Sequence, residues 1–235
     1  MTWKLIDTGT NSAEENMRTD AELLESIDKA PILHLYDWVG PSATYGYFTK
    51  PENYLNLEAV SKAGITLARR PTGGGIIFHT YDLAFSIIIP GSHPAYSTNT
   101  LQNYYFVNQM VIDVIRRFNN TLAPQLLPEE SLPKDITCAN FCMAKPTQYD
   151  VMIEGKKIGG AAQRRTKRGF LHQGSISLSP PEPKCKDYFL NPTVYDAMMV
   201  NTHPLLKEPY SPASVHLARK ELKKLFKSSI CNLSL

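Results

Sequence analysis

The sequence has no long apolar run and no recognisable export signal. Its most apolar segment, Leu83–Ile89, is far too short to span a bilayer. The segment Met1–Asp7 lacks the charged start and long apolar stretch of a signal peptide. The four cysteines are irregularly spaced, which in a chain without an export signal favours reduced thiols over a disulfide framework. These absences predict a cytoplasmic protein with no membrane partner.

An excess of charge of one sign is also missing. The 235 residues include 25 Lys and Arg against 22 Asp and Glu, a formal net charge of +3. That net charge is too small to predict binding to nucleic acid, although a local basic patch can still attract an acidic partner. Hydrophobic residues make up 43% of the chain, which is ordinary for a folded protein. The length fits one large domain, or a domain with a small appendage.

The most distinctive segment, Arg69–His79, lacks both common phosphate-binding motifs. Its three consecutive glycines have neither the Gly-Lys-Ser/Thr ending of a P-loop nor the Gly-x-Gly-x-x-Gly spacing of a dinucleotide fold. Three glycines beside an apolar strand pattern are unfavourable for backbone entropy, which predicts that something approaches the backbone closely. Arg69 and Arg70 next to exposed N–H groups suit an anion or a polarised carbonyl. A tight turn flanked by solvated arginines is the alternative.

Periodicity and turn residues predict an α+β fold with a mixed sheet flanked by helices. Strands are expected at Trp3–Ile6, Ile32–Tyr36, Ala43–Phe48, Ile65–Arg69, Gly75–His79, Leu83–Ile89, Gln148–Ile153, Lys156–Gly160 and Phe170–Leu178. Helices are expected after a capping box at Ser12, at Leu55–Ala63, at Leu101–Phe118 and after Ser211-Pro212. We also expect three connections: the second and third strands as neighbours, Gly75–His79 and Leu83–Ile89 as a hairpin, and Thr121–Asp135 as a loop.

A second chemistry-bearing segment runs from Glu154 to Arg165. In it Lys157 enters a run of small residues, where partial desolvation would make it a useful point charge for an acyl carbonyl or a phosphate. An ordinary hairpin with surface lysines is the alternative. Among the histidines, His79 and His172 lie beside glycine motifs, whereas His34 alternates with apolar residues and is expected to be packed.

The cysteines give a third candidate site. Cys138 and Cys142 are four residues apart, but Cys185 and Cys231 are too scattered to complete a zinc site, so no metal is expected. By chemistry alone each is more often a small buried hydrophobe than a nucleophile. A nearby lysine can nevertheless lower a thiol pKa and produce a reactive thiolate.

With these segments the sequence resembles the superfamily of lipoate–protein ligases, octanoyltransferases and biotin–protein ligases. The resemblance is carried by Arg69–Gly75 with His79 and by Lys157–Gln163, and it runs from about Trp3 to Leu178. It implies the lipoyl/biotinyl ligase-transferase catalytic fold, with the acyl chain in a tunnel beside the glycine loop. The implied reaction ends with an amide on a lysine of a lipoyl domain.

Within the superfamily the pattern is most similar to the cysteine-dependent octanoyltransferases. Their spacing of cysteine, proline, tyrosine and acidic residue is matched by Cys142, Pro146, Tyr149 and Asp150. The resemblance therefore implies Cys142 as the nucleophile and Lys157 as the group that polarises the thioester carbonyl. The substrate-binding residues that it implies are Arg69, Arg70, Thr72, Gly73, Gly74, Gly75, His79, Gly159, Gly160, Ala161, Ala162 and His172.

The sequence departs from the ligase pattern at two positions. Ligases usually have an aspartate after the loop histidine and an asparagine before the strand aspartate, and here these residues are Thr80 and Tyr149. Few residues follow Leu178, whereas ligases commonly carry a further C-terminal domain. Both points weaken the case for a ligase that forms an adenylate. The case for a biotin ligase is weaker too, because the Gly-Arg-Gly loop of that family is absent. We expect residues 1–180 to form an acyl-binding catalytic domain and residues 181–235 a helical C-terminal extension packed on it.

Three functions are therefore weighed. The first is transfer of an octanoyl or lipoyl group through a Cys142 acyl-enzyme, with acyl carrier protein as a possible donor and no cofactor. The second is an ATP- and Mg-dependent lipoate ligase, with Arg70 and Lys157 on the phosphate. The third is a non-catalytic protein that binds a lipoyl domain or an acyl group. The acceptors implied are lipoyl domains of 2-oxoacid dehydrogenases or the glycine-cleavage H protein; nucleic acid is not expected.

Overall fold

The computed structural model describes residues 2–129, 140–144 and 146–232. Its strands are β1 (Lys4–Asn11), β2 (Ile32–Trp38), β3 (Ser42–Tyr45), β4 (Thr66–Arg69), β5 (Ile76–His79), β6 (Asp82–Pro90), β7 (Gln125–Leu126), β8 (Val151–Ile153), β9 (Lys156–Arg165) and β10 (Gly169–Ser177). Its helices are α1 (Ala13–Glu25), α2 (Leu57–Lys62), α3 (Thr100–Phe118), α4 (Thr193–Asn201) and α5 (Pro212–Asn232), with 3-10 turns η1 (Pro51–Asn53) and η3 (Pro183–Tyr188).

The described strands form two sheets. The larger has seven strands in the order β1-β2-β6-β10-β9-β8-β7, and the smaller has three in the order β4-β3-β5. Both are mixed, because β1 runs parallel to β2 and β3 parallel to β4 while their other pairings are antiparallel. The α+β class and the mixed sheet flanked by helices are therefore confirmed.

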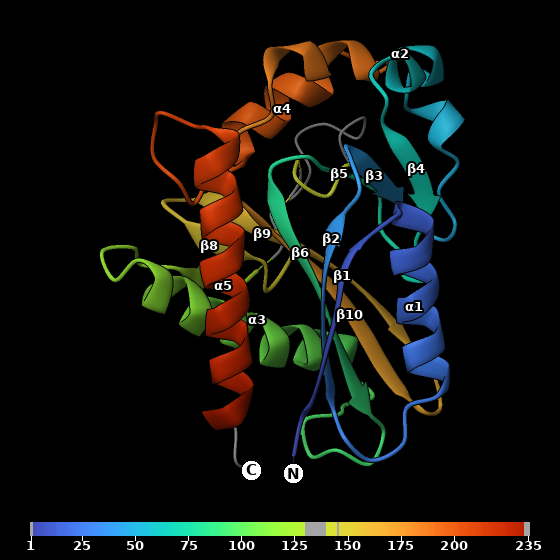
Figure 1. Ribbon diagram of the computed structural model, residues 1–235, viewed down its shortest axis with the longest axis vertical. Helices are drawn as coiled ribbons and strands as arrows, with labels where there is room; N and C mark the ends of the chain where they lie inside the picture. Colours follow the sequence, from blue (N-terminus) through green and yellow to red (C-terminus); the bar gives the residue numbers. More distant parts are fainter. Residues whose placement is uncertain (1, 130–139, 145, 233–235) are drawn as a thin grey trace.

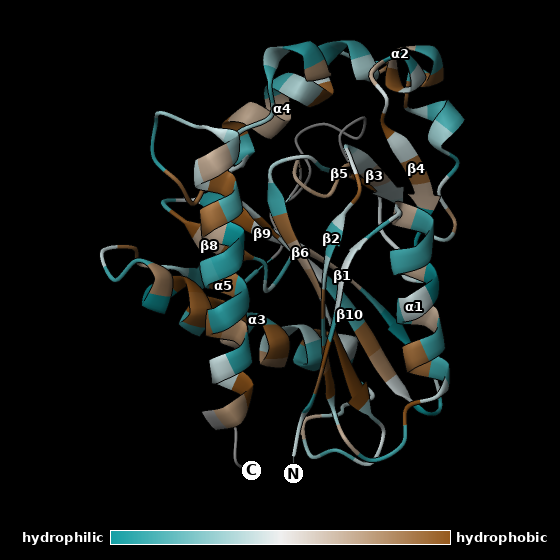
Figure 2. Ribbon diagram, viewed as in Figure 1, coloured by the Kyte–Doolittle hydropathy of each residue, from teal (hydrophilic) through white to brown (hydrophobic). Residues whose placement is uncertain are grey.

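Helices cover both faces of the large sheet (Figure 1). On one face α3 and α5 pack on β6 and β10 around Phe85 and Phe226, whose ring centroids are 4.5 Å apart. On the other face α1 packs through Ala13 and Met17 against Tyr36. A second core lies under the small sheet, where α4 and η3 cover β5. Brown and teal segments alternate along α1 and α5 in Figure 2, as expected for helices with one buried face.

Local sequence explains several of these boundaries. The Ser12 hydroxyl accepts from Glu15 N (3.2 Å), and the Glu15 carboxylate accepts from Ser12 N (3.0 Å), so the predicted capping box starts α1. The Ser211 hydroxyl accepts from Ser214 N (3.0 Å) and begins α5, with Pro212 at its first position. The turn Glu154-Gly155 has positive φ at both residues, and it joins β8 to β9 as expected.

The predicted hairpin between Gly75–His79 and Leu83–Ile89 is wrong. β5 pairs with β3 in the small sheet, whereas β6 pairs with β2 and β10 in the large one. Thr80 and Tyr81 carry the chain from one sheet to the other, because the side chains of His79 and Asp82 on either side of the turn are engaged in a buried polar cluster. A local propensity pattern identifies two strands but not which sheet each joins.

Two other predictions about strands also need correction. The second and third predicted strands are not neighbours, since β2 lies in the large sheet and β3 in the small one. β3 ends at Tyr45, because Gly46 leaves the strand to pack against the glycine loop. The predicted loop Thr121–Asp135 contains the short strand β7, and its residues 130–135 lie outside the described part of the chain, as does Cys138. The sequence reasoning missed α4.

No described helix is both long and apolar enough to cross a membrane.

Candidate active site

Arg70 holds the glycine loop in shape from inside. It is 4% exposed, and all five of its N–H donors are used within the chain. Nη1 donates to the Thr44 carbonyl and hydroxyl (both 3.0 Å), Nε to the Thr72 hydroxyl (3.3 Å), and Nη2 to the carbonyls of Gly73 (2.9 Å) and Gly75 (2.8 Å). The geometry thus makes Arg70 a support for the loop and leaves it no donor for an anion.

Two of the three loop glycines are required, and at Gly75 the reason is the close approach that the sequence predicted. Gly74 has φ +84°, which disfavours other residues, and a Cβ on it would lie 3.3 Å from Arg70 Nη2 and 3.8 Å from Cys142 Sγ. A Cβ on Gly75 would overlap the carbonyl of Asn140. A Cβ on Gly73, by contrast, meets no atom within 4 Å. What approaches this backbone is therefore the chain segment that carries Cys142.

That segment is attached to the start of β5. Ile76 N donates to Asn140 O (2.7 Å), and Cys142 N donates to Ile76 O (3.3 Å), which places the cysteine directly beside the glycine loop. The Cys142 thiol is half-buried. Two strictly local features of the sequence, a glycine run and a cysteine more than sixty positions later, meet here.

Lys157 stands on the other side of Cys142 and is held by Asp150. Its Nζ lies 2.6 Å from Asp150 Oδ2, and both side chains are 2% exposed. The same carboxylate oxygen accepts from the Thr147 N–H (2.6 Å) and hydroxyl (2.9 Å). A Cβ on Gly160 would lie 3.6 Å from Lys157 Cε and 3.8 Å from Cys142 Cβ, so this glycine keeps the space between the two residues open.

Two adjoining cavities meet at Cys142. The outer cavity, of about 380 Å³, is lined by Cys142, Lys157, the three loop glycines and the alanines 161 and 162. The inner cavity, of about 30 Å³, shares Cys142 and both alanines and continues to Arg70, His79 and Gly160. These two cavities bring together most of the residues that the sequence analysis selected.

The remaining selected residues do not line either cavity. Arg69 is exposed, and its guanidinium lies 4.7 Å from the ring centroid of Tyr47. Thr72 is fully buried and donates to Gln173 Oε1 (2.6 Å). Gly159 packs against the carbonyl of Ser175 in the neighbouring strand. His172 is fully buried behind the cavity wall.

A buried polar cluster behind the inner cavity was not found by sequence reasoning. His79 Nδ1 donates to Asp82 Oδ2 (2.7 Å), which also accepts from the Ser175 hydroxyl (2.6 Å). Burial acts to raise the pKa of Asp82, but the charge and hydrogen bond of His79, with the bond from Ser175, outweigh it and hold the pKa below the ordinary value. The sequence held one signal for this cluster: side chains alternate between the two faces of a strand, and this alternation puts Ser175 on the face of β10 that meets Asp82.

A second buried pair confirms that His34 is packed. His34 is 0% exposed, and its Nδ1 lies 2.8 Å from Asp20 Oδ1. The other Asp20 oxygen accepts from Ser86 (2.7 Å) and from Gln173 Nε2 (2.6 Å). Because Gln173 also receives the Thr72 bond, this cluster is continuous with the glycine loop.

Two further aromatic residues near the outer cavity have shifted pKa values. Burial lowers the pKa of His172 to about 3, so its ring is neutral. Burial also raises the pKa of Tyr104 well above the ordinary value, and the negative charges of Asp150 and Cys142 raise it further. Tyr104 lines the outer cavity, although the sequence analysis placed it only within the helix expected at Leu101–Phe118.

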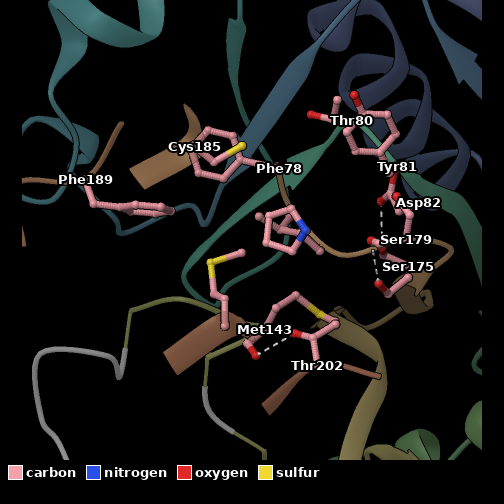
Figure 3. A pocket seen from close by; sticks show the side chains of 14 residues that line it. Phe78, Thr80, Tyr81, Asp82, Met143, Ser175, Ser179, Cys185, Phe189 and Thr202 are labelled. Atoms are coloured by element: carbon pink, nitrogen blue, oxygen red, sulfur yellow. Dashed lines mark hydrogen bonds between the residues drawn. The ribbon is translucent and has the colours of Figure 1, made fainter. Parts of the chain in front are cut away.

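A third cavity, of about 60 Å³, lies behind Met143, the residue after Cys142 (Figure 3). Its wall combines Phe78, Cys185 and Phe189 from the second core with hydroxyl groups of β10 and the segment that follows it. Burial raises the pKa of the Cys185 thiol, so this cysteine stays protonated and unreactive and serves as a packed core residue.

Comparison with known proteins places this geometry in a family. The model of the lipoyl protein ligase A/B catalytic domain matches residues 12–226. Octanoyltransferase LipM of Halalkalibacterium halodurans is 31% identical over 234 residues, covering 96% of this chain and 84% of the relative. Octanoyltransferase LipM of Bacillus subtilis is 32% identical over 198 residues, covering 82% of this chain and 71% of the relative.

Solved structures share the fold. A bi-partite lipoate protein ligase of Thermoplasma acidophilum, solved in a study of that ligase and its E2 lipoyl domain, superposes with a TM-score of 0.73 at 22% identity, covering 98% of this chain and 84% of that chain. LipL1 of P. falciparum in complex with lipoate gives a TM-score of 0.61 at 19% identity, covering 95% and 62% of the two chains.

Proposed function

The chain belongs to the lipoyl protein ligase A/B catalytic domain family, and from that premise we propose that it is an acyltransferase that moves an octanoyl group onto the lysine of a lipoyl domain. Relatives above 30% identity that bear the name octanoyltransferase support this reading. The observation that carries the mechanism is the placement of the Cys142 thiol between Lys157 and the glycine loop, in one cavity of about 380 Å³.

In the first step the Cys142 thiolate attacks the carbonyl carbon of an octanoyl thioester on a carrier protein. A bond forms between Sγ and the carbonyl carbon, and the carbonyl oxygen becomes an oxyanion. When this intermediate collapses, the bond from carbon to the carrier sulfur breaks, and the carrier leaves as a thiolate that takes up the proton given up by Cys142. The product is an octanoyl thioester on Cys142, with no change of oxidation state.

In the second step the uncharged ε-amine of the acceptor lysine attacks the same carbonyl carbon. An amide bond forms, the bond to Cys142 Sγ breaks, and the amine loses one proton as the thiolate is regenerated. The products are an octanoylated lipoyl domain and free enzyme. Each step passes through an oxyanion, so the same hydrogen-bond donors serve both.

Donors for this oxyanion are available beside Cys142. Within the described residues, the backbone N–H groups of Gly74 and Gly75 donate to no other group of the protein. Lys157, held in place by Asp150, brings a positive charge to the same cavity. Removing one donor of this kind typically raises a barrier by about 3–4 kcal/mol.

The alternative of an ATP-dependent lipoate ligase is less well supported by the site. That function assigned Arg70 and Lys157 to the phosphate, and the donors of Arg70 are all used by Thr44, Thr72 and the glycine loop. Arg70 therefore does not fit the role in phosphate binding that this function gives it, whereas Lys157 lines the cavity. We propose that the protein works in the cytoplasm without ATP, with acyl carrier protein as donor and lipoyl domains of 2-oxoacid dehydrogenases or H protein as acceptors.

One assay separates the functions. Protein is mixed with an apo lipoyl domain and either octanoyl acyl carrier protein without ATP, or free lipoate with ATP and Mg. We expect modification with the thioester alone, lost in Cys142→Ser and retained in Cys231→Ser, which changes an exposed cysteine. Modification that requires ATP and survives in Cys142→Ser would identify a ligase, and no modification under either condition would favour a binding protein.

A further inference from the structure

Tyr104 is an aromatic residue of the outer cavity that neither the family resemblance nor the reaction scheme uses. It lies near the start of α3 and lines the cavity together with Cys142 and Lys157. The nearby Thr147 hydroxyl is bonded to Asp150. The phenol oxygen of Tyr104 accepts a hydrogen bond from the Gln163 backbone N–H, and its O–H donates to no other group among the described residues. Tyr104 therefore brings a hydrogen-bond donor to the cavity that it lines together with the glycine loop.

The ring of Tyr104 is held by the ring of His172. His172 meets it edge to face, with ring centroids 5.5 Å apart and an interplanar angle of 62°. The His172 ring is in turn fixed by the Gln163 side chain, whose Nε2 lies 2.8 Å from its Nδ1, and by stacking with Phe85 at 6.3 Å. This support, with the Gln163 backbone N–H on the phenol oxygen, places the phenol and leaves its O–H proton available for donation.

The protonation states are suited to donation. A neutral His172 accepts the Gln163 amide at Nδ1 and carries its proton at Nε2. Burial, with the charges of Asp150 and Cys142, keeps the Tyr104 phenol protonated across the physiological range. A protonated phenol beside a developing negative charge donates a hydrogen bond and gives up no proton.

We propose that Tyr104 is a further catalytic residue, whose hydroxyl donates a hydrogen bond to the carbonyl oxygen of the thioester as it becomes an oxyanion. Tyr104 belongs to α3, so its bond adds to those of the glycine-loop N–H groups, which line the same cavity. The role rests on the proposed acyl transfer and applies to both steps, since the oxyanion forms at the same carbon. His172 is then a positioning residue, which explains a buried histidine without a contact to the cavity.

The test uses Tyr104→Phe, which removes only the hydroxyl and keeps the ring contact with His172. The matched control is Tyr105→Phe, at the next position of α3, where the side chain is 51% exposed and packs on Tyr149. Single-turnover acylation of Cys142 is followed by intact-protein mass spectrometry, with octanoyl-N-acetylcysteamine as the thioester. We expect acylation to be about 100-fold slower in Tyr104→Phe and within about twofold of wild type in Tyr105→Phe.

A second readout separates donation from damage to the site. Alkylation of Cys142 by iodoacetamide needs no oxyanion donor, so its rate in Tyr104→Phe should remain within about twofold of wild type. Equal acylation rates in Tyr104→Phe and wild type would overturn the inference while leaving the proposed function intact. A matching fall in the alkylation rate of Tyr104→Phe would overturn the inference too, because the variant would then have changed the reactivity of the Cys142 thiol rather than the stability of the oxyanion. Wild-type protein that never acquires an octanoyl group would contradict the proposed function itself.

Discussion

Asp150 and Lys157 form a buried ion pair, and this burial determines what happens when one partner is removed. In Asp150→Asn the buried ammonium loses the carboxylate that lies 2.6 Å from it, and we expect the free energy of unfolding to fall by about 3 kcal/mol. Urea denaturation monitored by circular dichroism measures it. The control is Asp196→Asn, which breaks the exposed pair with Lys186 (46% and 58% exposed) and should change the unfolding free energy by less than about 1 kcal/mol.

The double variant Asp150→Asn/Lys157→Met tests whether the loss comes from breaking this pair. Removing both charges should destabilise the protein by less than the sum of the two single changes, because the attraction between the two residues is lost only once. Additive losses would mean that the ion pair itself does not couple these residues.

His172 predicts a pH dependence of stability. Its pKa is about 3 in the folded protein, whereas the ordinary pKa of histidine is 6.5, so between these values the unfolded chain binds a proton that the folded chain does not. The contribution of His172 to the free energy of unfolding is therefore fully present above pH 6.5, and it is lost as the pH is lowered toward 3. Between pH 7 and pH 5 the loss amounts to roughly 2 kcal/mol.

Urea denaturation at these two pH values, in wild type and His172→Phe, isolates this contribution. The variant keeps an aromatic ring beside Phe85 but cannot titrate, so it should lose roughly 2 kcal/mol less than wild type on acidification. His216→Phe, at an exposed position, should behave as wild type. An unchanged difference between the two pH values in His172→Phe would show that this histidine is not held neutral.

At the scale of elements, the glycine loop and the Cys142 segment are one unit. In Gly75→Ala the new methyl group overlaps the Asn140 carbonyl, so the cysteine segment must move off β5. We expect a loss of about 1–3 kcal/mol in unfolding free energy and a fall in Cys142 acylation of at least about tenfold. Gly73→Ala, whose methyl group meets nothing within 4 Å, should be close to wild type in both measurements. Equal behaviour of the two variants would contradict the close approach.

The elements also show what sequence patterns can and cannot predict. The capping box at Ser12 and the periodicity of Leu101–Phe118 predicted α1 and α3 well, because both signals are local. The pairing of β5 was predicted wrongly, since it depends on the buried contacts of His79 rather than on strand propensity. The motif residues Cys142 and Lys157 were found through resemblance, whereas Tyr104 carried no local signal beyond its helix position.

At the scale of the whole molecule, α5 completes the main core. Its residues Val215, Leu222 and Phe226 are buried against the large sheet, and Arg219 donates to the Asp82 carbonyl (2.7 Å). We propose that residues 181–235 fold as part of the catalytic domain. A chain ending at Tyr210 should therefore lose cooperative urea unfolding and acylation together, because the apolar face of β6 is left open. A cooperative, active fragment would show that the extension is separable.

The central claim is a covalent octanoyl thioester on Cys142, and intact-protein mass spectrometry tests it directly. Protein is incubated with octanoyl acyl carrier protein without ATP, separated from the donor, and then mixed with an apo lipoyl domain. The account predicts that wild type and Cys231→Ser gain the mass of one octanoyl group, mapped to Cys142, and pass it to the lipoyl domain. Transfer by wild type without any acylated enzyme, or transfer by Cys142→Ser at the wild-type rate, would contradict it.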